Sequence, residues 1–266
     1  MNMKEVLIYL GCGVMCCTYA HRAEAEKPAS RKIAPESRKA APETRKAPET
    51  KKTTKPATTT AQVTRFRFKM YFNGKACGKY TRREVKQPSG QTTVHNNTNF
   101  SFKYWFWTVK GVNKSTLHYT KTGMLKKFKV YSKVRGKLSE VWGTQNAKGI
   151  TISVKKGGRT KKKFFSKKQY DSTSLDLRFK IKPVGKKYTR RQLNIPKQTI
   201  LKQSYTYSKD KPQKWFGKTW DVYKVEFVSK RGKAWLWFSN GGWIVGTKFK
   251  IPVGKMSMKL KRATRS

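Results

Sequence analysis

Basic and apolar residues alternate one by one along several strand-length segments of this chain, and this alternation limits what the chain can fold into. Arg67 and Lys69, for example, are interleaved with Phe66, Phe68 and Met70. Successive side chains of an extended strand point to opposite faces, so a period of two puts the apolar set in a core and the basic set in water. The pattern therefore predicts half-buried β-strands with basic outer faces. Further basic residues in such segments are Lys127, Lys129, Lys133, Arg178, Lys180, Lys182, Lys248, Lys250, Lys259 and Lys261.

Turn signals separate these segments. Asn73-Gly74 suits a two-residue hairpin because both residues tolerate positive φ. Short strands with regular Gly-containing turns predict an all-β fold, an antiparallel incomplete barrel or wrapped sheet. Residues 166–199, which include Pro183 and Pro196, are the expected place for a helix or a crossover loop. Strands are expected at 65–72, 75–86, 93–109, 115–121, 125–134, 138–144, 150–156, 161–165, 220–229, 234–238, 243–251 and 255–261.

Two other segments precede the predicted β domain of residues 65–266. Residues 1–25 combine a basic start, an apolar stretch of 12 residues and a small-x-small site at Ala23-Glu24-Ala25. This pattern predicts a cleaved signal peptide, with an uncleaved N-terminal anchor as the alternative. Residues 26–64 repeat Arg-Lys and Pro-Glu units and contain no aromatic residue, so a disordered linker is expected there.

Cysteine and histidine content limits the chemistry of the mature chain. Three of the four Cys lie in the predicted signal, so cleavage leaves Cys77 alone, and a monomer without an internal disulfide is expected. Cys77 with His95 and His118 is too small a set for an ordinary four-ligand zinc site, so we expect no metal. Neither paired catalytic groups nor a nucleophile or phosphate-loop motif is recognisable. We therefore expect no cofactor and no enzymatic activity.

The net charge points to a partner. The chain has 63 Lys and Arg against 13 Asp and Glu, a net charge of +50, and residues 65–266 alone carry 51 basic and 7 acidic residues, hence +44. Solubility needs only about 2 to 8 net charges in a small domain. Self-repulsion of this size favours anion binding, so we expect an anionic polymer as partner and the basic residues named above as candidate contacts. A charged coat that only confers solubility is the competing interpretation.

An aromatic run from Phe100 to Trp107 allows a second kind of contact. Within the expected strand 93–109, Trp105 and Trp107 share one face, and Tyr104 and Phe106 share the other. Such a strand is either central and covered, or it exposes a row of rings to a ligand. Trp105 and Trp107 are therefore candidates for an aromatic ligand face.

Three groups of turn and core residues carry a family resemblance. They are Phe66-x-Phe68-x-x-x-x-Asn73-Gly74-Lys75-x-x-Gly78, Gly123-Met124-Leu125, and Trp235-Leu236-Trp237-Phe238-x-x-Gly241-Gly242-Trp243 with Gly254. With them the chain resembles a family of exported bacterial β-rich proteins of unknown function, which have an F-x-V-x-x-x-G-x-x-G start and a W-Y-D-x-x-G-x-W closing hairpin. Leu117-His118-Tyr119 stands where that family has an acidic residue and a Trp, and Ser239 replaces the hairpin Asp. The resemblance implies a periplasmic or secreted incomplete barrel and implies no activity.

Together these patterns predict an exported, non-enzymatic β protein that binds an anionic polymer through Lys-rich sheet faces. Lipopolysaccharide, acidic polysaccharide and nucleic acid all have the required charge. One alternative is a periplasmic carrier that holds an acyl or other apolar ligand inside the half-open barrel. Another is a nucleic-acid packaging protein, which requires that residues 1–25 are not a signal.

Overall fold

The computed structural model describes residues 60–175, 182–215, 218–229, 232–240, 242–251 and 254–266. The predicted signal peptide and nearly all of the predicted linker lie outside these residues. None of the described segments forms a helix long and apolar enough to cross a membrane. The strands are β1 (Gln62–Phe72), β2 (Lys75–Lys86), β3 (Thr92–Tyr104), β4 (Trp107–Tyr119), β5 (Leu125–Val134), β6 (Lys137–Gln145), β7 (Gly149–Lys156), β8 (Arg159–Ser166), β9 (Ser172–Thr173), β10 (Lys187–Asn194), β11 (Thr199–Trp215), β12 (Lys218–Ser229), β13 (Gly232–Ser239), β14 (Ile244–Ile251) and β15 (Gly254–Arg265), with 3-10 turns η1 (Lys167–Gln169) and η2 (Ile195–Lys197).

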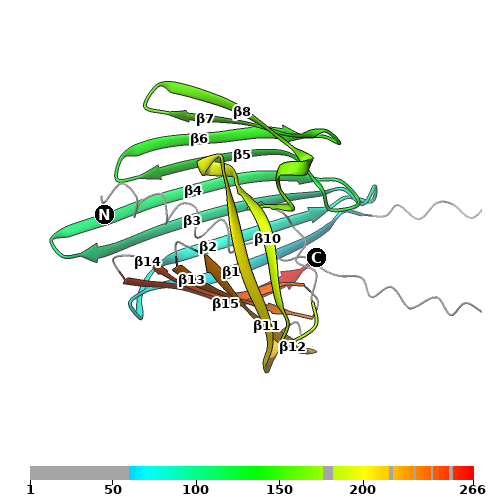
Figure 1. Cartoon of the computed structure of the whole chain (residues 1–266). Coiled ribbons are helices and arrows are strands. Elements are labelled where there is room, and N and C mark those ends of the chain that lie inside the picture. Colours follow the sequence, from blue (N-terminus) through cyan, green and yellow to red (C-terminus); the bar gives the residue numbers. More distant parts are fainter. Residues whose placement is uncertain (1–59, 176–181, 216–217, 230–231, 241, 252–253) are drawn as a thin grey trace, which may run out of the picture.

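All these strands belong to one sheet, in the order β8-β7-β6-β5-β4-β3-β2-β1-β15-β14-β13-β12-β11-β10-β9. Every neighbouring pair is antiparallel except β9 and β10, which run parallel. Figure 1 shows the sheet curling round from β8 to the β10–β11 hairpin. Within the described residues β8 and β9 are the two ends of the sheet, and no ladder joins them. The predicted all-β fold, an incomplete antiparallel barrel, is confirmed.

The alternation in β1 places its side chains as predicted. Phe66, Phe68 and Met70 are buried, whereas Arg67 and Lys69 are exposed. The strand begins at Gln62, three residues before the strand expected from Arg65. It pairs with β2 on one side and with β15 on the other, so the first and last strands of the domain lie side by side.

Two apolar clusters fill the concave side of the sheet. One joins β1 to β4 with β11 to β15 and is rich in aromatic rings, with centroids 4.2 Å apart for Phe72 and Phe102 and 4.5 Å for Trp220 and Trp243. The other lies against β3 to β8 and also contains Leu193. Aromatic pairs at such distances add stability beyond their buried area. The sheet is therefore held in its curl by two separate cores.

The end of the sheet at β9 and β10 folds back toward the opposite end, where β7 and β8 lie. Leu193 and Ile195 pack into the cluster that contains Ile152 of β7. The side-chain amide of Gln198 donates a hydrogen bond to the carbonyl oxygen of Ile152 at 3.0 Å. In Figure 1 the β10–β11 hairpin accordingly crosses the green strands. This fold-back covers part of the concave side.

Residues 166–199 are more regular than predicted, and the strand that follows was not predicted. The segment holds η1, β9, β10 and η2, and β11 then runs for 17 residues. Of the β11 side chains only Tyr207 is buried, so the sequence of β11 shows no clear apolar alternation. Its ladder with β12, rather than its own pattern, makes it a strand. Residues 176–181 lie outside the described residues.

The expected continuous strand 93–109 is wrong. Tyr104 pairs with Trp107, so β3 and β4 form a hairpin whose two-residue turn is Trp105-Phe106. Trp105 has a φ of 53°, which bulky residues rarely adopt and which turn rules reserve for Gly or Asn. Trp105 therefore lies in a turn and Trp107 in the following strand, and the two do not form one strand face.

Candidate functional site

A row of three Lys crosses the outer face where β2, β1 and β15 run side by side. Lys69 of β1 lies directly opposite Lys79 of β2 on one side and Lys259 of β15 on the other. All three side chains are exposed. Since adjacent strands are about 4.8 Å apart, the three Cα atoms lie within roughly 10 Å. The fold thus concentrates charges that are far apart in the sequence.

Two further like-charged pairs extend this row along the strands. Arg67 is opposite Arg262, and Arg65 is opposite Arg83. The acidic residue of these three strands, Glu84, is buried on the concave side. Like charges directly opposite each other in a ladder are destabilising. The basic outer face, as we call it below, consists of Arg65, Arg67, Lys69, Lys79, Arg83, Lys259, Lys261 and Arg262.

Strands β14 and β13 add Lys and aromatic side chains beside the basic outer face. Lys248 and Lys250 of β14 are exposed, and Lys250 is opposite Lys255 of β15. Lys248 is opposite Trp235, and its Nζ lies 5.9 Å from the centroid of that ring. Trp235 and Trp237 are half-buried on β13. Aromatic surface therefore borders the Lys rows on this side.

The other predicted basic contacts lie elsewhere. Lys127, Lys129 and Lys133 are exposed on β5, four strands from β1 and so roughly 19 Å away. Lys182 is exposed ahead of β10, with its Nζ 5.9 Å from the ring centroid of Tyr188. Arg178 and Lys180 lie outside the described residues. The structure thus brings together the candidates on β1, β14 and β15 and separates them from those on β5.

Two histidines occupy the outer face of β3 and β4, between these groups. His95 Nδ1 lies 3.3 Å from Thr116 Oγ1, and His118 Nδ1 lies 3.3 Å from Thr93 Oγ1. Burial, followed by the charges of Arg83 and His118, lowers the pKa of His95 below its ordinary value of 6.5. His95 is therefore neutral at neutral pH, and a nearby anion would favour its protonation.

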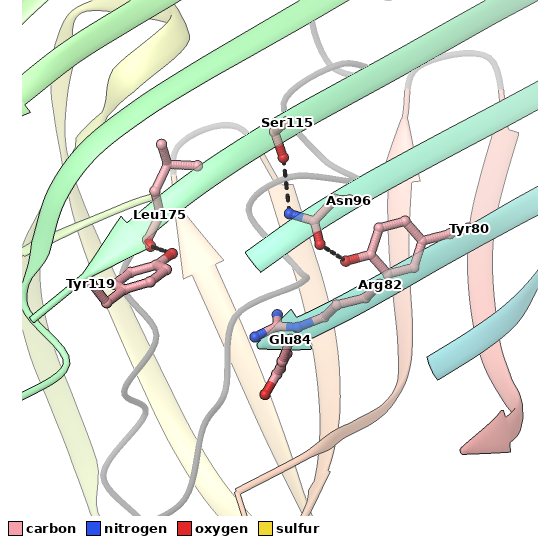
Figure 2. Close-up of polar contacts among 7 residues, drawn as sticks. All are labelled: Tyr80, Arg82, Glu84, Asn96, Ser115, Tyr119 and Leu175. Carbon is pink, nitrogen blue, oxygen red and sulfur yellow. Dashed lines mark hydrogen bonds and ion pairs between the residues drawn. The ribbon is translucent and has the colours of Figure 1, made fainter. Parts of the chain in front are cut away.

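The concave side of β2, β3 and β4 carries a buried polar cluster. Figure 2 shows the Tyr80 hydroxyl donating to Asn96 Oδ1 at 2.7 Å, and the Asn96 amide donating to Ser115 Oγ at 2.9 Å. On β2 itself the guanidinium of Arg82 pairs with Glu84, and both side chains are about 5% exposed. A buried charge must be paired, and these two side chains pair with each other on the same strand.

A small hollow opens beside this cluster. It has room for about one water molecule. Asn113, 4% exposed on β4, has no hydrogen-bond partner for either amide atom in the described part of the chain. Among the described residues no three His, Cys, Asp or Glu gather into a metal site. The hollow is lined by Phe66, Phe68, Tyr80, Arg82, Glu84, Trp243, Ile244 and Met258.

Sequence reasoning missed four members of the basic outer face. The residues not among the predicted contacts are Arg65, Lys79, Arg83 and Arg262, although each is exposed. In β2 the inward positions include Arg82 and Glu84, so basic and apolar residues do not alternate there. Lys79 beside Tyr80 was the signal that could have been used. For Arg262 the register of β15 against β1 was needed, because a bulge follows Arg67.

Comparisons with known proteins bear on the fold alone. No family model matches the chain, and no curated protein matches it. The structure is similar to that of a β-barrel-like protein of a domain of unknown function, DUF1849, from Brucella abortus. The TM-score is 0.55 at 10% sequence identity, and the match covers 77% of this chain and 98% of the Brucella chain. This likeness supports the β-barrel-like architecture.

Proposed function

We propose that this protein is an exported, non-enzymatic β protein that binds an anionic polymer through its basic outer face. The observation that carries the proposal is the row of Lys79, Lys69 and Lys259 on three adjacent strands. Their mutual repulsion lowers the stability of the free protein. A bound polyanion removes that repulsion, so folding and binding are linked.

The geometry suits an extended polymer. Outward side chains repeat about every 4.8 Å across the strands and about every 6.8 Å along them, which gives a grid of cations on a surface. Long, flexible Lys side chains adapt to anions at uneven spacing. Recognition by such a grid is steeply salt-dependent and weakly selective for sequence. Nucleic acid, lipopolysaccharide and acidic polysaccharide share the repeated anionic group that it needs.

Location decides which of these polymers is available. The predicted signal peptide and the family resemblance of the turn motifs support a periplasmic or secreted protein. Lipopolysaccharide and acidic polysaccharide are then the partners at hand. A nucleic-acid packaging role requires that the chain stay in the cytosol, so fractionation of the native host separates the two.

The apolar-carrier alternative has less support. The concave side is half-open, but two cores occupy it. The hollow between Phe66 and Trp243 has room for about one water and cannot take an acyl chain. A carrier would have to open this core before it could load its ligand.

Two matched triple variants test the proposal. The first changes Lys69, Lys79 and Lys259 to Gln. The second changes Lys127, Lys129 and Lys133 to Gln, which removes the same charge from β5. Fluorescence anisotropy with labelled heparin fragments, lipopolysaccharide and single-stranded DNA, over a series of salt concentrations, measures affinity and its salt dependence.

The first variant is expected to lose affinity on the order of a hundredfold at about 0.1 M salt, with a salt slope for single-stranded DNA smaller by about 2. The β5 variant should lose much less. Equal losses in the two variants would mean that only net charge matters and would refute a defined face.

A further inference from the structure

The β3–β4 hairpin extends beyond the last residues that it pairs with on both neighbouring strands. Its last pair with β2 is Phe100 with Gly78, and its last pair with β5 is Gly111 with Val134. In the described part of the sheet residues 101–109 form ladder pairs only within the hairpin, and the carbonyl oxygen of Lys110 also accepts a hydrogen bond from the backbone N–H of Arg135. Four residues of strand beyond those last pairs make an extension of roughly 13 Å before the turn. In Figure 1 this hairpin reaches furthest to the left.

Large aromatic side chains occupy the tip of this extension. Trp105 is 80% exposed, Phe106 97% and Trp107 51%. Trp105 also has a φ of 53°, a conformation that costs free energy for a bulky residue. Asn-Gly in place of Trp105-Phe106 would form a two-residue hairpin turn at a lower cost in free energy. Apolar rings held in water on a strained turn suggest a contact outside the chain.

Positive charge surrounds the tip. Lys103 and Lys110 are exposed on the hairpin itself, and Arg135 of the neighbouring turn lies 5.2 Å from the ring centroid of Trp107. No acidic residue occurs between Glu84 and Glu140 in the sequence. Whatever surface the tip meets is therefore one that accepts apolar rings and also carries negative charge.

We propose that the β3–β4 tip, hereafter the aromatic tip (Trp105, Phe106 and Trp107), inserts into the interface of a lipid bilayer with anionic headgroups. Trp and other aromatic rings prefer the headgroup level of a bilayer, where the ring enters the apolar boundary. Basic residues just behind the rings meet the negative surface potential, which falls off within a Debye length. The hairpin length lets the tip reach the bilayer without the rest of the sheet.

The aromatic tip is distinct from the basic outer face. Trp107 lies on the same face of the hairpin as Phe102 and Val109, whose side chains point to the concave side of the sheet. Anchoring by the aromatic tip would thus leave the basic outer face open to a polymer. The proposal stands whether or not the basic outer face binds a polyanion.

One variant, hereafter the ring variant, removes the two rings of the turn, keeps Trp107 and favours the turn conformation. Trp105→Asn with Phe106→Gly supplies the residues that a two-residue hairpin prefers, so the hairpin should form at least as well. The control variant, Lys103→Gln with Lys110→Gln, removes charge and keeps the rings. Circular dichroism and thermal unfolding confirm that both variants are folded.

Binding is measured with the full chain and brominated phosphatidylcholine vesicles, with and without about 30% phosphatidylserine to supply surface charge. Residues 1–59 contain no Trp, so quenching of Trp fluorescence by the brominated lipid reports only on the folded part. The wild type should be quenched, most strongly on anionic vesicles. The ring variant should lose the quenching and at least about tenfold of the partition coefficient.

The control variant should lose about fivefold per removed charge on anionic vesicles and nothing on neutral ones. Full quenching of the ring variant would overturn the proposal. A wild type that shows no quenching on either kind of vesicle would also overturn it. This includes the case in which sedimentation shows a dimer of the wild type that the ring variant abolishes. Heparin affinity of the ring variant should equal that of the wild type, which separates this result from the fate of the basic outer face.

Discussion

Replacing Lys69 by Gln is expected to stabilise the fold while it weakens polyanion binding. Lys69 is the middle member of the Lys row and has a like-charged residue directly opposite on both sides. Gln keeps the length and polarity of the exposed side chain and removes only the charge. Replacing an ordinary exposed Lys would show neither effect. A gain in stability together with a loss of polyanion affinity is therefore specific to a Lys with like-charged neighbours on both sides.

The magnitude follows from Coulomb repulsion. Two ammonium groups about 7 Å apart repel by about 0.6 kcal/mol at the dielectric constant of water, and by more near the protein surface. Two neighbours therefore destabilise the fold by about 1 to 2 kcal/mol at low salt. Loss of the contact between Lys69 Nζ and the Tyr71 ring, 5.9 Å from its centroid, costs about 0.5 kcal/mol. The net gain is about 1 kcal/mol, or roughly 2 to 4 °C in Tm for a domain of this size.

Urea unfolding at low and at high salt measures the change in the free energy of unfolding. The gain should shrink at about 0.5 M salt, because the Debye length then falls well below the spacing of the charges. Lys162→Gln is the matched control, since Lys162 is exposed on β8 and lies opposite Ser153. A destabilised Lys69→Gln variant, or a gain that salt leaves unchanged, would show that repulsion in the row is not what limits stability.

Three other predictions concern single residues. The pKa of His95 is lowered in the folded state, so its contribution to stability is present above pH about 6.5 and is lost as pH falls from there through the folded-state pKa. Polyanion affinity should rise as pH falls over the same interval, because a bound anion stabilises the imidazolium. In a pH series of binding titrations, His95→Gln should remove that rise. Burial raises the pKa of the Cys77 thiol to about 11, so a thiol reagent at pH 8 should react far more slowly with native protein than with urea-unfolded protein, and equal rates would contradict the buried position. A Cβ on Gly111 would lie 2.3 Å from Cζ of Phe100, which is 1% exposed, so Gly111→Ala should lower the free energy of unfolding by about 1 to 3 kcal/mol; adding Phe100→Leu should recover part of that loss in chemical denaturation, and a purely additive double variant would exclude this clash as the cause.

The orientation of individual strands could be predicted from the sequence. In β1 the basic residues point outward and Phe66, Phe68 and Met70 point inward, and Met256 and Met258 of β15 are buried in the same way. This works because the two-residue period is a local property of the extended backbone. The turn at Asn73-Gly74 is equally local, since both residues have positive φ there.

The β3–β4 turn and the β10–β11 hairpin could not be predicted in this way. Trp105 adopts a positive φ without the small residue that signals it, and β11 has one buried side chain in 17 residues. The β3–β4 turn is fixed by the pairing of these two strands with each other, and β11 is a strand because of its ladder with β12. Local propensity is too weak to compete with such pairing.

The sequence alone determined that the domain is a sheet and which side chains of β1 and β15 meet water, because those depend on each strand's own period. Only the tertiary structure decided that Lys69 lies between Lys79 and Lys259, and that Arg82 and Glu84 are buried together. Cross-strand neighbours depend on strand order and register, and β15 joins β1 across nearly the whole domain. Residues almost 200 positions apart become neighbours only when the sheet curls, so the concentration of charge on the basic outer face is a property of the fold.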